Sequence, residues 1–284
     1  MSQLLRAWER EHRFYAELAE GFPIRVPRAL ANLADTDSGR YALVLEDLAP
    51  RRNLDQVKGA SPADAALAVD VLARFHSAFY EHPSLAELDW MPDLDDPMVD
   101  SVRPMFDMGW PAFTARYGDD LPERVLRWTE AFASQVPEWL AGYRHLPRTL
   151  VHGDFRADNL FIADDGEVAV IDWQLSMKAP GGADIAYLLL TNLTPEVRRA
   201  HATELYERYL RGLDEGGAPE AARDRDAAWA GFCEGALFYC VSFAGGLLTL
   251  DPANDRGVAL FDALVRRSFA AADDLDAGGV LGLG

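Results

Sequence analysis

Lysine and cysteine are both scarce in this sequence. Its 284 residues include only two lysines, Lys58 and Lys178, and two cysteines, Cys233 and Cys240. The cysteines share one apolar helical pattern, which predicts neither a metal knuckle nor a disulfide framework, so we expect them to fill the core. The 46 acidic residues outnumber the 27 lysines and arginines, and the net charge of -19 would repel nucleic-acid phosphates. We therefore predict no nucleic-acid partner, whereas a cationic substrate would be attracted.

Long hydrophobic runs are also missing. No uninterrupted apolar stretch approaches the roughly 20 residues that span a bilayer. The N-terminus carries Glu9, Arg10, Glu11 and Arg13 among its apolar residues and is not a signal sequence. These absences predict a cytoplasmic protein without a membrane partner. The composition, with 49% hydrophobic and 26% charged residues, predicts a globular chain that buries a substantial core.

Apolar periodicity and turn residues predict a mixture of helices and short strands. Residues 83–122 show poor periodicity, so we expect a long insertion there that contributes to a binding surface. Residues 277–284 are expected to form a flexible tail. Helices are expected at residues 2–20, 61–82, 122–144, 195–212, 218–250 and 254–274, and strands at 28–34, 40–45, 160–162 and 168–171, the last two forming a β-hairpin.

The most informative segment is a polar loop that leads into this hairpin. It reads HGDFRADN from His152 to Asn159, and the second hairpin strand ends at Asp172. Because a hairpin brings its two ends side by side, Asp154, Asn159 and Asp172 can share a pocket. Kinase-type phosphoryl transfer uses this spacing, with one acid to orient the attacking hydroxyl and an amide and a second acid to hold Mg²⁺. The sequence therefore predicts an ATP-dependent small-molecule kinase.

These residues resemble a known superfamily, that of aminoglycoside phosphotransferases, choline kinases and ecdysteroid-kinase-like proteins, above all its bacterial ecdysteroid-kinase-like members. The similarity covers most of the chain and is most specific in the HGDFRADN loop. It is carried by residues 152–159 and 171–174, and more weakly by residues 11–15, 43–48 and 182–187.

The resemblance implies an α+β, protein-kinase-like fold with two lobes. Residues 1–46 would form an incomplete N-terminal nucleotide-binding lobe, residues 47–50 a hinge, and residues 51–284 a mostly helical lobe for catalysis and substrate binding. It further implies ATP and Mg²⁺ as cofactors, and a hydroxyl group of a small molecule as the phosphoryl acceptor.

The resemblance also assigns the residues that bind the nucleotide. Adenine would meet the chain at the hinge, at Glu46, Asp47 and Leu48. The phosphates and their Mg²⁺ would be held by Asn159 and Asp172.

Five further residues receive roles by the same resemblance. Asp154 would be the catalytic carboxylate that accepts or orients the proton of the attacking hydroxyl, and Arg156 would reach the transferred phosphate unless it pairs with a surface carboxylate. His152 would fix the shape of the loop, and Asp184 would brace it, although Asp184 could equally be a helix cap. Glu11 would pair with a phosphate-binding lysine, yet neither lysine of this chain precedes it, so a solvated glutamate is an equal reading.

Two features that such kinases need are missing ahead of Glu11: a glycine-rich phosphate cover and a strand lysine. We therefore expect a truncated N-terminus, explained by a missed start codon, a decayed gene or a binding protein without catalysis. The intact set of Asp154, Asn159 and Asp172 favours the first. This chain should then bind nucleotide poorly and an extended form well. The open edge of a two-stranded sheet would also permit a dimer.

Two rival functions stay open at this stage. The chain could be a non-catalytic kinase-like binding module, or a metal-dependent hydrolase with His152, Asp154 and Asp172 as ligands. The acceptor could be an aminoglycoside, a choline-like amine, a sterol or a sugar. A cation-holding aromatic pocket is one hypothesis for it, with ordinary packing as the alternative; the residues concerned are Trp90, Trp110, Tyr117 and Trp128, near Asp93, Asp95, Asp96, Asp100 and Asp107.

Overall fold

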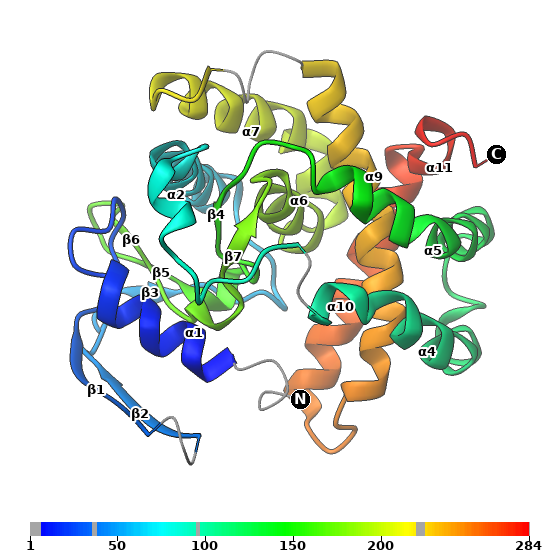
Figure 1. The fold of residues 1–284 in the computed structure, drawn as a ribbon. Coiled ribbons are helices and arrows are strands. Elements are labelled where there is room, and N and C mark those ends of the chain that lie inside the picture. The colour runs from blue at the N-terminus through cyan, green and yellow to red at the C-terminus, as the bar shows by residue number, and fades with distance from the viewer. Residues whose placement is uncertain (1–6, 36–38, 95–96, 220–224, 284) are drawn as a thin grey trace.

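Helices make up most of the computed structural model, which describes residues 7–35, 39–94, 97–219 and 225–283 (Figure 1). Asp95 and Asp96, two acids of the hypothetical cation pocket, lie outside the described residues. The helices are α1 (Ala7–Arg13, continued by a π-helical turn, Phe14–Leu18), α2 (Pro62–Phe79), α3 (Pro97–Asp100), α4 (Val102–Tyr117), α5 (Glu123–Tyr143), α6 (Gly182–Thr191), α7 (Pro195–Glu215), α9 (Arg225–Gly246), α10 (Asp255–Asp274) and α11 (Ala277–Val280).

The strands of the described residues form three small antiparallel sheets. In the hairpin of β5 and β6, Leu160 lies opposite Val170, as the sequence predicts. The β1–β2 sheet leaves Leu33 and Val44 exposed. The sheets are β1 (Ala29–Asp35) with β2 (Arg40–Leu45), β3 (Arg52–Asn53) with β5 (Leu160–Ile162) and β6 (Val168–Val170), and β4 (Thr149–Val151) with β7 (Met177–Ala179).

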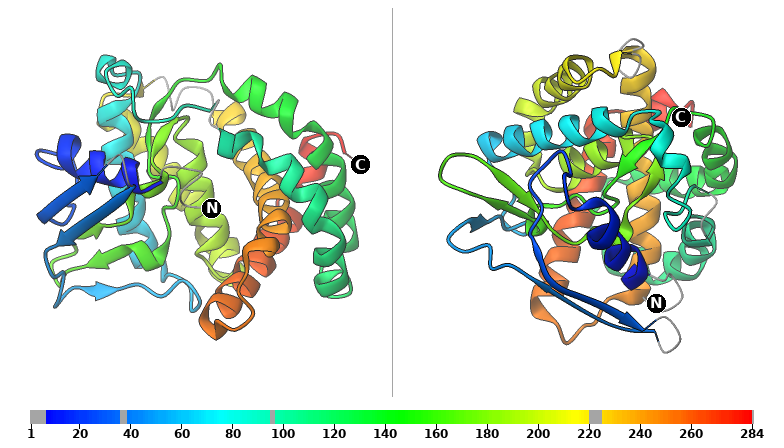
Figure 2. Two further views of the ribbon diagram at one scale, coloured as in Figure 1. Left: turned by 60° about the horizontal axis from the view of Figure 1, so that its bottom comes forward. Right: turned by 60° about the vertical axis from the view of Figure 1, so that its left-hand side comes forward.

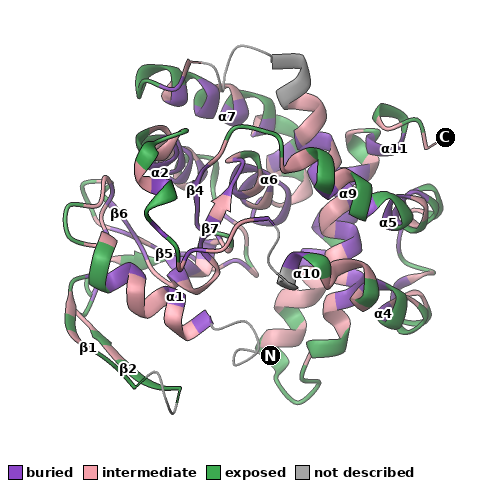
Figure 3. Ribbon diagram, in the orientation of Figure 1, coloured by how far each residue is buried: buried purple, intermediate pink, exposed green. Residues whose placement is uncertain are grey.

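The elements divide into two groups with a shared centre (Figures 1 and 2). The helix α1 and the β1–β2 sheet lie on one side, and the helices α4, α5, α9, α10 and α11 lie on the other. Between them are β4, β7 and α6, and α6 is buried along most of its length (Figure 3). The architecture is therefore α+β, as expected. The boundaries at residues 46 and 50 stay a prediction.

Helix α2 begins where its cap residues predict. The Ser61 side chain accepts a hydrogen bond from the Asp64 backbone N–H at 3.1 Å, and Pro62 occupies the first turn. Its buried face, which includes Leu72 and Phe75, packs against α7 and β4. This helix thus supports the strand that precedes the HGDFRADN loop.

Stacked aromatic rings attach the N-terminal helix to the rest of the molecule. Phe14 and Trp173 stack with their ring centroids 4.1 Å apart and their planes 6° apart. Phe22 and Phe75 contact Trp173 edge-on, and all of these rings belong to the core. Because Trp173 directly follows Asp172, this stacking places α1 beside the end of the β5–β6 hairpin.

The fold of residues 83–122 could not be predicted from their poor periodicity, and α4 occupies much of this segment; that the segment is an insertion contributing to a binding surface stays a prediction. Helix α4 packs closely on α9 at a glycine. A Cβ atom added at Gly109 would lie 2.4 Å from the Ala244 carbonyl oxygen. The helical signal is weak in the sequence because a glycine makes the contact and Pro111 interrupts the pattern.

The expected flexible tail is also wrong for the described residues 277–283. They include the short helix α11, in which Ala277 is fully buried and Gly278 lies against the Trp128 indole. A Cβ added at Gly278 would come within 2.2 Å of indole atoms, so tertiary packing holds this segment.

One segment, Trp229–Thr249, is long and apolar enough to cross a membrane by length and composition alone. Glu234 interrupts this segment, so it is not the uninterrupted apolar stretch whose absence was noted in the sequence. The segment covers most of α9, which packs against α4, α5, α6 and α10. A helix that is apolar on all sides is typical of a protein core as well as of a membrane span. Cys233 and Cys240 lie on it, unbonded and buried, as expected.

Candidate active site

One buried carboxylate binds the backbone of the loop that follows β4. Asp184, in the first turn of α6, accepts hydrogen bonds from the backbone N–H groups of His152 at 2.6 Å and Gly153 at 2.9 Å. His76 Nε2 lies 3.2 Å from the same carboxylate. Burial opposes ionisation of Asp184, but the contacts with His76 and the loop outweigh it and lower its pKa. Asp184 therefore ties the loop to α6 and α2.

Gly153 has a backbone conformation that the loop requires. Its φ is +81°, in the left-handed region that L side chains rarely adopt. A Cβ at this position would also lie 2.2 Å from the Leu175 carbonyl oxygen. Glycine lets the loop pass close to the segment after Asp172, which brings the two ends of the hairpin together.

The buried His152 ring links the same two segments. Its Nδ1 accepts a hydrogen bond from the Asp154 backbone N–H at 3.2 Å, and its Nε2 donates to the Ile171 carbonyl oxygen at 2.9 Å. Both ring nitrogens are thus engaged, which leaves none to ligate a metal. Within the described part of the chain, no group of three or more His, Cys, Asp or Glu residues is placed to hold a metal ion. This geometry disfavours the metal-hydrolase alternative.

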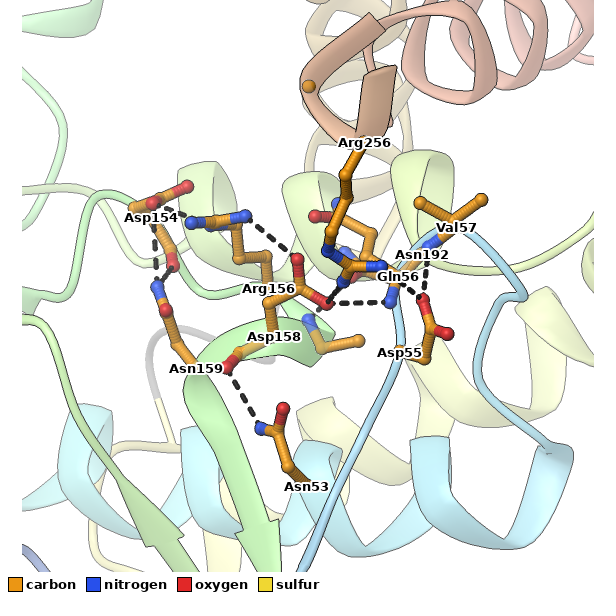
Figure 4. Close-up of polar contacts among 12 residues, drawn as sticks. Asn53, Asp55, Gln56, Val57, Asp154, Arg156, Asp158, Asn159, Asn192 and Arg256 are labelled. Carbon is orange, nitrogen blue, oxygen red and sulfur yellow. Dashed lines mark hydrogen bonds and ion pairs between the residues drawn. The ribbon is translucent and has the colours of Figure 1, made fainter. Parts of the chain in front are cut away.

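Asp154 lies at one end of a network of polar contacts (Figure 4). Its Oδ2 accepts a hydrogen bond from Arg156 Nε at 2.9 Å, and its backbone oxygen accepts one from Asn159 Nδ2 at 3.0 Å. The amide nitrogen of Asn159 is therefore occupied, and its Oδ1 is the atom that remains to bind a cation. The Tyr187 side chain also hydrogen-bonds to the Asp154 carboxylate.

Asp172 completes the predicted trio. It adopts a left-handed conformation with φ of +69°, and the Ile171 N–H before it donates to the Asn159 carbonyl oxygen at 3.1 Å. Burial, followed by the nearby Asp154 charge, raises the pKa of Asp172. The structure thus brings Asp154, Asn159 and Asp172 together, and their negative charge favours a bound cation.

Glu11 on α1 faces the same site, but without a lysine. Burial, followed by the Asp172 charge, raises its pKa to about 7, while a hydrogen bond from the Trp173 N–H partly opposes the shift. Lys58 pairs with Asp55 at 3.1 Å, and Lys178 Nζ lies 3.4 Å from the Leu88 carbonyl oxygen. Both earlier readings of Glu11 are therefore wrong for this structure: it is neither paired with lysine nor simply solvated.

We predict that Glu11 makes the metal-free protein less stable as the pH rises through about 7. The carboxyl ionises near pH 4.5 in the unfolded chain but near pH 7 in the folded chain, so between these values the folded state binds more protons. The folded state is stabilised by the protonated form of Glu11, and this contribution is complete below pH 4.5 and lost above pH 7. The loss amounts to at most about 3 kcal/mol, at 1.36 kcal/mol per pKa unit.

Urea unfolding in EDTA at about pH 5.5 and about pH 8 measures this dependence. Glu11→Gln should be the more stable protein at the higher pH and should reduce the pH dependence. Glu20→Gln is the matched control, because Glu20 is exposed near the same helix. Equal pH dependence in wild type and Glu11→Gln would contradict the prediction.

The predicted adenine site lies where β2 ends. The Glu46 carboxylate accepts a hydrogen bond from the Arg28 N–H at 2.9 Å and pairs with Arg25, so its side chain is committed to the protein. The Arg28 N–H, followed by Arg25, lowers the pKa of Glu46. Asp47 is exposed, and Leu48 is buried. The Glu46 side chain is therefore not available to a base, and contact with adenine would fall to backbone groups and to the neighbouring side chains.

The Asp158 side chain connects the loop to two other segments of the chain, a role that sequence reasoning missed (Figure 4). Its carboxylate accepts hydrogen bonds from Arg156 Nη1 at 3.2 Å, Arg256 Nη2 at 3.0 Å and the Gln56 backbone N–H at 2.9 Å. Arg156 thus pairs with two carboxylates, as its alternative reading expected, and its contact with phosphate stays a prediction. Nothing near Arg256 in the sequence indicates this contact, because α10 reaches the loop only in the folded chain.

Tyr187 is another residue that the sequence analysis missed. It lies on α6 close to Asp154, and burial, followed by the Asp154 charge, raises its pKa well above the usual value. Its ring contacts that of Tyr239, with the centroids 5.2 Å apart. One available signal was its spacing, since Tyr187 comes one helical turn after Asp184.

The hypothetical aromatic cation pocket does not form from the residues proposed for it. Three of its rings already have an arginine of this chain over them, at 5.0 to 5.5 Å from the centroid. Trp110 stacks instead between Phe106 and Phe113 in the core. The three pairs are Arg13 with Trp90, Arg116 with Tyr117, and Arg124 with Trp128.

Comparison with known protein families gives one match that covers most of the chain. The profile of the phosphotransferase enzyme family matches residues 2–228. Over 96 residues, the chain is also 42% identical to acyl-CoA dehydrogenase family member 10 of Mus musculus, a match that covers 28% of this chain. The chain spans only 9% of the length of that curated relative.

Solved structures with similar folds include several kinases. The chain is similar to a putative aminoglycoside phosphotransferase of Ralstonia eutropha, with TM-score 0.56, 17% identity and coverage of 95% of this chain and 84% of that one. For a choline/ethanolamine kinase family protein of Mesorhizobium loti, the TM-score is 0.53 and the identity 16%, with coverage of 99% of this chain and 84% of that one. For choline kinase LicA of Streptococcus pneumoniae, the TM-score is 0.51 and the identity 15%, with coverage of 94% of this chain and 82% of that one. These likenesses confirm the expected kinase-like α+β fold.

Proposed function

This chain belongs to the phosphotransferase enzyme family, and on that premise we propose that it transfers the γ-phosphoryl group of ATP to a hydroxyl group of a small molecule. The observation that carries the proposal is the meeting of Asp154, Asn159 and Asp172 on two segments joined by one hairpin. The structure of LicA in complex with AMP, at 14% identity and TM-score 0.50, supports the use of an adenine nucleotide.

Asp154 is the proposed base of the reaction. The acceptor oxygen bonds to the γ-phosphorus, its proton passes to the Asp154 carboxylate, and the bond to the bridging oxygen breaks to release ADP. Arg156 Nε holds Asp154 Oδ2 at 2.9 Å, so the contact with the acceptor hydroxyl is assigned to the other oxygen, Oδ1. Arg156 also brings a positive charge to the loop, which suits it to contact the transferred phosphoryl group.

The donor atoms near Asp154 fit a magnesium ion. The Asp172 carboxylate and the Asn159 amide oxygen are hard oxygen ligands of the kind that Mg²⁺ prefers. Burial, followed by the Asp154 charge, raises the pKa of Asp172, and a bound cation would favour its ionised form. When bound, Mg²⁺ neutralises charge on the nucleotide phosphates. Backbone groups of Glu46, Asp47 and Leu48 would then meet the adenine.

One observation keeps a second candidate function in view, that of a catalytically impaired or non-catalytic binding protein. No lysine contacts Glu11 in the described part of the chain, although kinases of this type use such a lysine to hold phosphate. ATP consumption that depends on an acceptor and disappears in Asp154→Ala would exclude this alternative. Cytoplasmic location and dimer formation stay predictions.

Thermal unfolding with nucleotides tests the proposed function. ATP with Mg²⁺ should raise the Tm by several degrees at about 100 times its dissociation constant, which corresponds to about 2.7 kcal/mol of stabilisation. Mg²⁺ or ATP alone should raise it less. Asp172→Asn should lose most of the Mg²⁺-dependent part, whereas Asp164→Asn, at an exposed hairpin turn, should retain it. A Tm that does not respond to any nucleotide would contradict nucleotide binding.

A further inference from the structure

An apolar pocket lies beside the HGDFRADN loop, on the side where α5 and α9 pack. Its volume is ≈ 260 Å³, and it lies between β4, β7 and α6 on one side and α5 and α9 on the other (Figure 1). Its walls are mainly carbon, with lining residues that include Val102, Leu140, Val151, Met177, Phe238 and Tyr239. No step of the proposed phosphoryl transfer described above uses this space.

The pocket borders the segment that carries Asp154. Gly153 lines the pocket, and Asp154 is the next residue of the chain. Tyr239 lines the pocket as well and contacts Tyr187, whose side chain hydrogen-bonds to Asp154. These two connections are the basis on which one end of a molecule seated in the pocket is assigned to the proposed base.

The described lining residues offer no free charge to a ligand. Among them, Asp184 is the one residue with an acidic or basic side chain, and that carboxylate is already bound by the N–H groups of His152 and Gly153 and by His76. The described lining therefore has no free carboxylate with which to pair an ammonium group, and burying an unpaired charge is costly.

The aromatic rings of the lining do not form a cage for a cation. Trp139 stacks on both Tyr143 and Phe238, with centroids 4.9 Å and 5.1 Å apart, so its ring faces meet other rings. Its indole N–H donates to Glu234 at 2.8 Å. The chain's net charge of -19 attracts cations at long range, but salt screens that attraction beyond about 10 Å. The local lining decides what fits.

We propose that this pocket holds the body of the phosphoryl acceptor, and that the acceptor is a neutral alcohol with an apolar body. The inference rests on the proposed function, since it names the substrate class of the same site. A cavity of about 150 Å³ admits benzene, so this pocket has room for roughly ten carbon atoms. The acceptor hydroxyl points past Gly153 to Asp154, and the hydrocarbon body is removed from water among the apolar side chains.

Gly231 on α9 offers a way to fill the pocket without disturbing the fold. It lines the pocket, and a Cβ atom added there meets nothing within 4 Å. Gly231→Phe should place its ring in the space assigned to the acceptor, and loss of a helix-interior glycine favours the helix. Gly142→Phe on α5 is the matched control, because Gly142 also meets nothing within 4 Å but does not line this pocket.

Steady-state assays should compare a neutral secondary alcohol of roughly ten carbons with choline and a polyamino aminoglycoside. We expect the alcohol to have the highest kcat/KM. Gly231→Phe should lower it by about tenfold or more, the size of effect that one methylene has in an apolar pocket, chiefly through KM. Gly142→Phe should match wild type. Preference for either cation, or an alcohol KM that Gly231→Phe leaves unchanged, would overturn the inference.

Titration calorimetry of the alcohol without nucleotide separates failure of the inference from failure of the proposed function. Binding to wild type and to Gly142→Phe, with loss in Gly231→Phe, supports the pocket as an alcohol site. If such binding is seen but no acceptor is phosphorylated and ATP with Mg²⁺ does not shift the Tm, the proposed function has failed and the acceptor role falls with it. If ATP binds but the alcohol does not, the inference alone is wrong.

Discussion

Asp154→Asn is expected to lower kcat for phosphoryl transfer by about 10²- to 10⁴-fold, the usual contribution of a general base. Asparagine keeps the size of the side chain and can still accept a hydrogen bond from Arg156, but it cannot take the proton of the acceptor hydroxyl. The KM for ATP should change by a few-fold at most, because Asn159 and Asp172 are untouched. Single-turnover measurement of labelled phosphate transfer checks the expectation.

Asp164→Asn is the charge-matched control for this change. Asp164 lies in the exposed turn of the same β5–β6 hairpin, so its replacement alters the net charge equally without touching the loop. Its kcat should equal that of wild type. A kcat of Asp154→Asn within a few-fold of wild type would remove Asp154 from the reaction and favour the binding-protein alternative.

Asp184→Ala is expected to lower the free energy of unfolding by about 3–5 kcal/mol. This is the usual cost of removing one partner from a buried ion pair, because the remaining partner is left buried without compensation. The change leaves the N–H groups of His152 and Gly153 without their acceptor and leaves His76 without its carboxylate. Urea unfolding at neutral pH measures the loss. Asp184→Asn should be less harmful, because its amide oxygen can still accept one of these hydrogen bonds.

The same variants separate stability from loop positioning. If Asp184 positions the loop, Asp184→Asn should lower kcat at temperatures where it is still fully folded, with little change in the KM for ATP. Asp214→Ala, at an exposed acid on α7, should change stability by no more than about 0.5 kcal/mol and leave kcat unchanged. A folded Asp184→Asn protein with full kcat would show that Asp184 only stabilises the fold.

Three acidic side chains lie close together where the proposed reaction occurs. Glu11, Asp154 and Asp172 lie close enough to raise the pKa values of two of them, and Arg156 is already shared with Asp158. Bringing a nucleotide triphosphate to this site without a cation would add further repulsion. Nucleotide binding and Mg²⁺ binding should therefore be strongly interdependent, in line with the thermal-unfolding experiment above.

The sequence by itself determined the features that depend on neighbouring residues. The hairpin of β5 and β6 follows from two short apolar runs on either side of the Asp165-Gly166 turn, and the start of α2 follows from its Ser61-Pro62 cap. Once that hairpin forms, the loop before it and Asp172 after it must lie side by side. The meeting of Asp154, Asn159 and Asp172 was therefore predictable from local structure.

Tertiary structure decided everything that depends on contacts between distant segments. Stacking of Phe14 on Trp173 packs α1 against the end of the hairpin, and the burial of Glu11 there, followed by the nearby Asp172 charge, moves the pKa of Glu11 to about 7. Helix α4 was missed because Gly109 and Pro111 interrupt its helical pattern, while its close contact with α9 forms only in the folded chain.

The pocket proposed for the acceptor best illustrates the difference between what the sequence determines and what the tertiary structure determines. Its walls come from helices and strands far apart in the chain, from Leu94 to Ser242, and each of their residues reads in sequence as ordinary core. Periodicity predicts which side chains are buried, but not where packing leaves a space. The sequence thus determined the proposed reaction chemistry through one hairpin, whereas only the folded chain decided what shape of molecule can approach it.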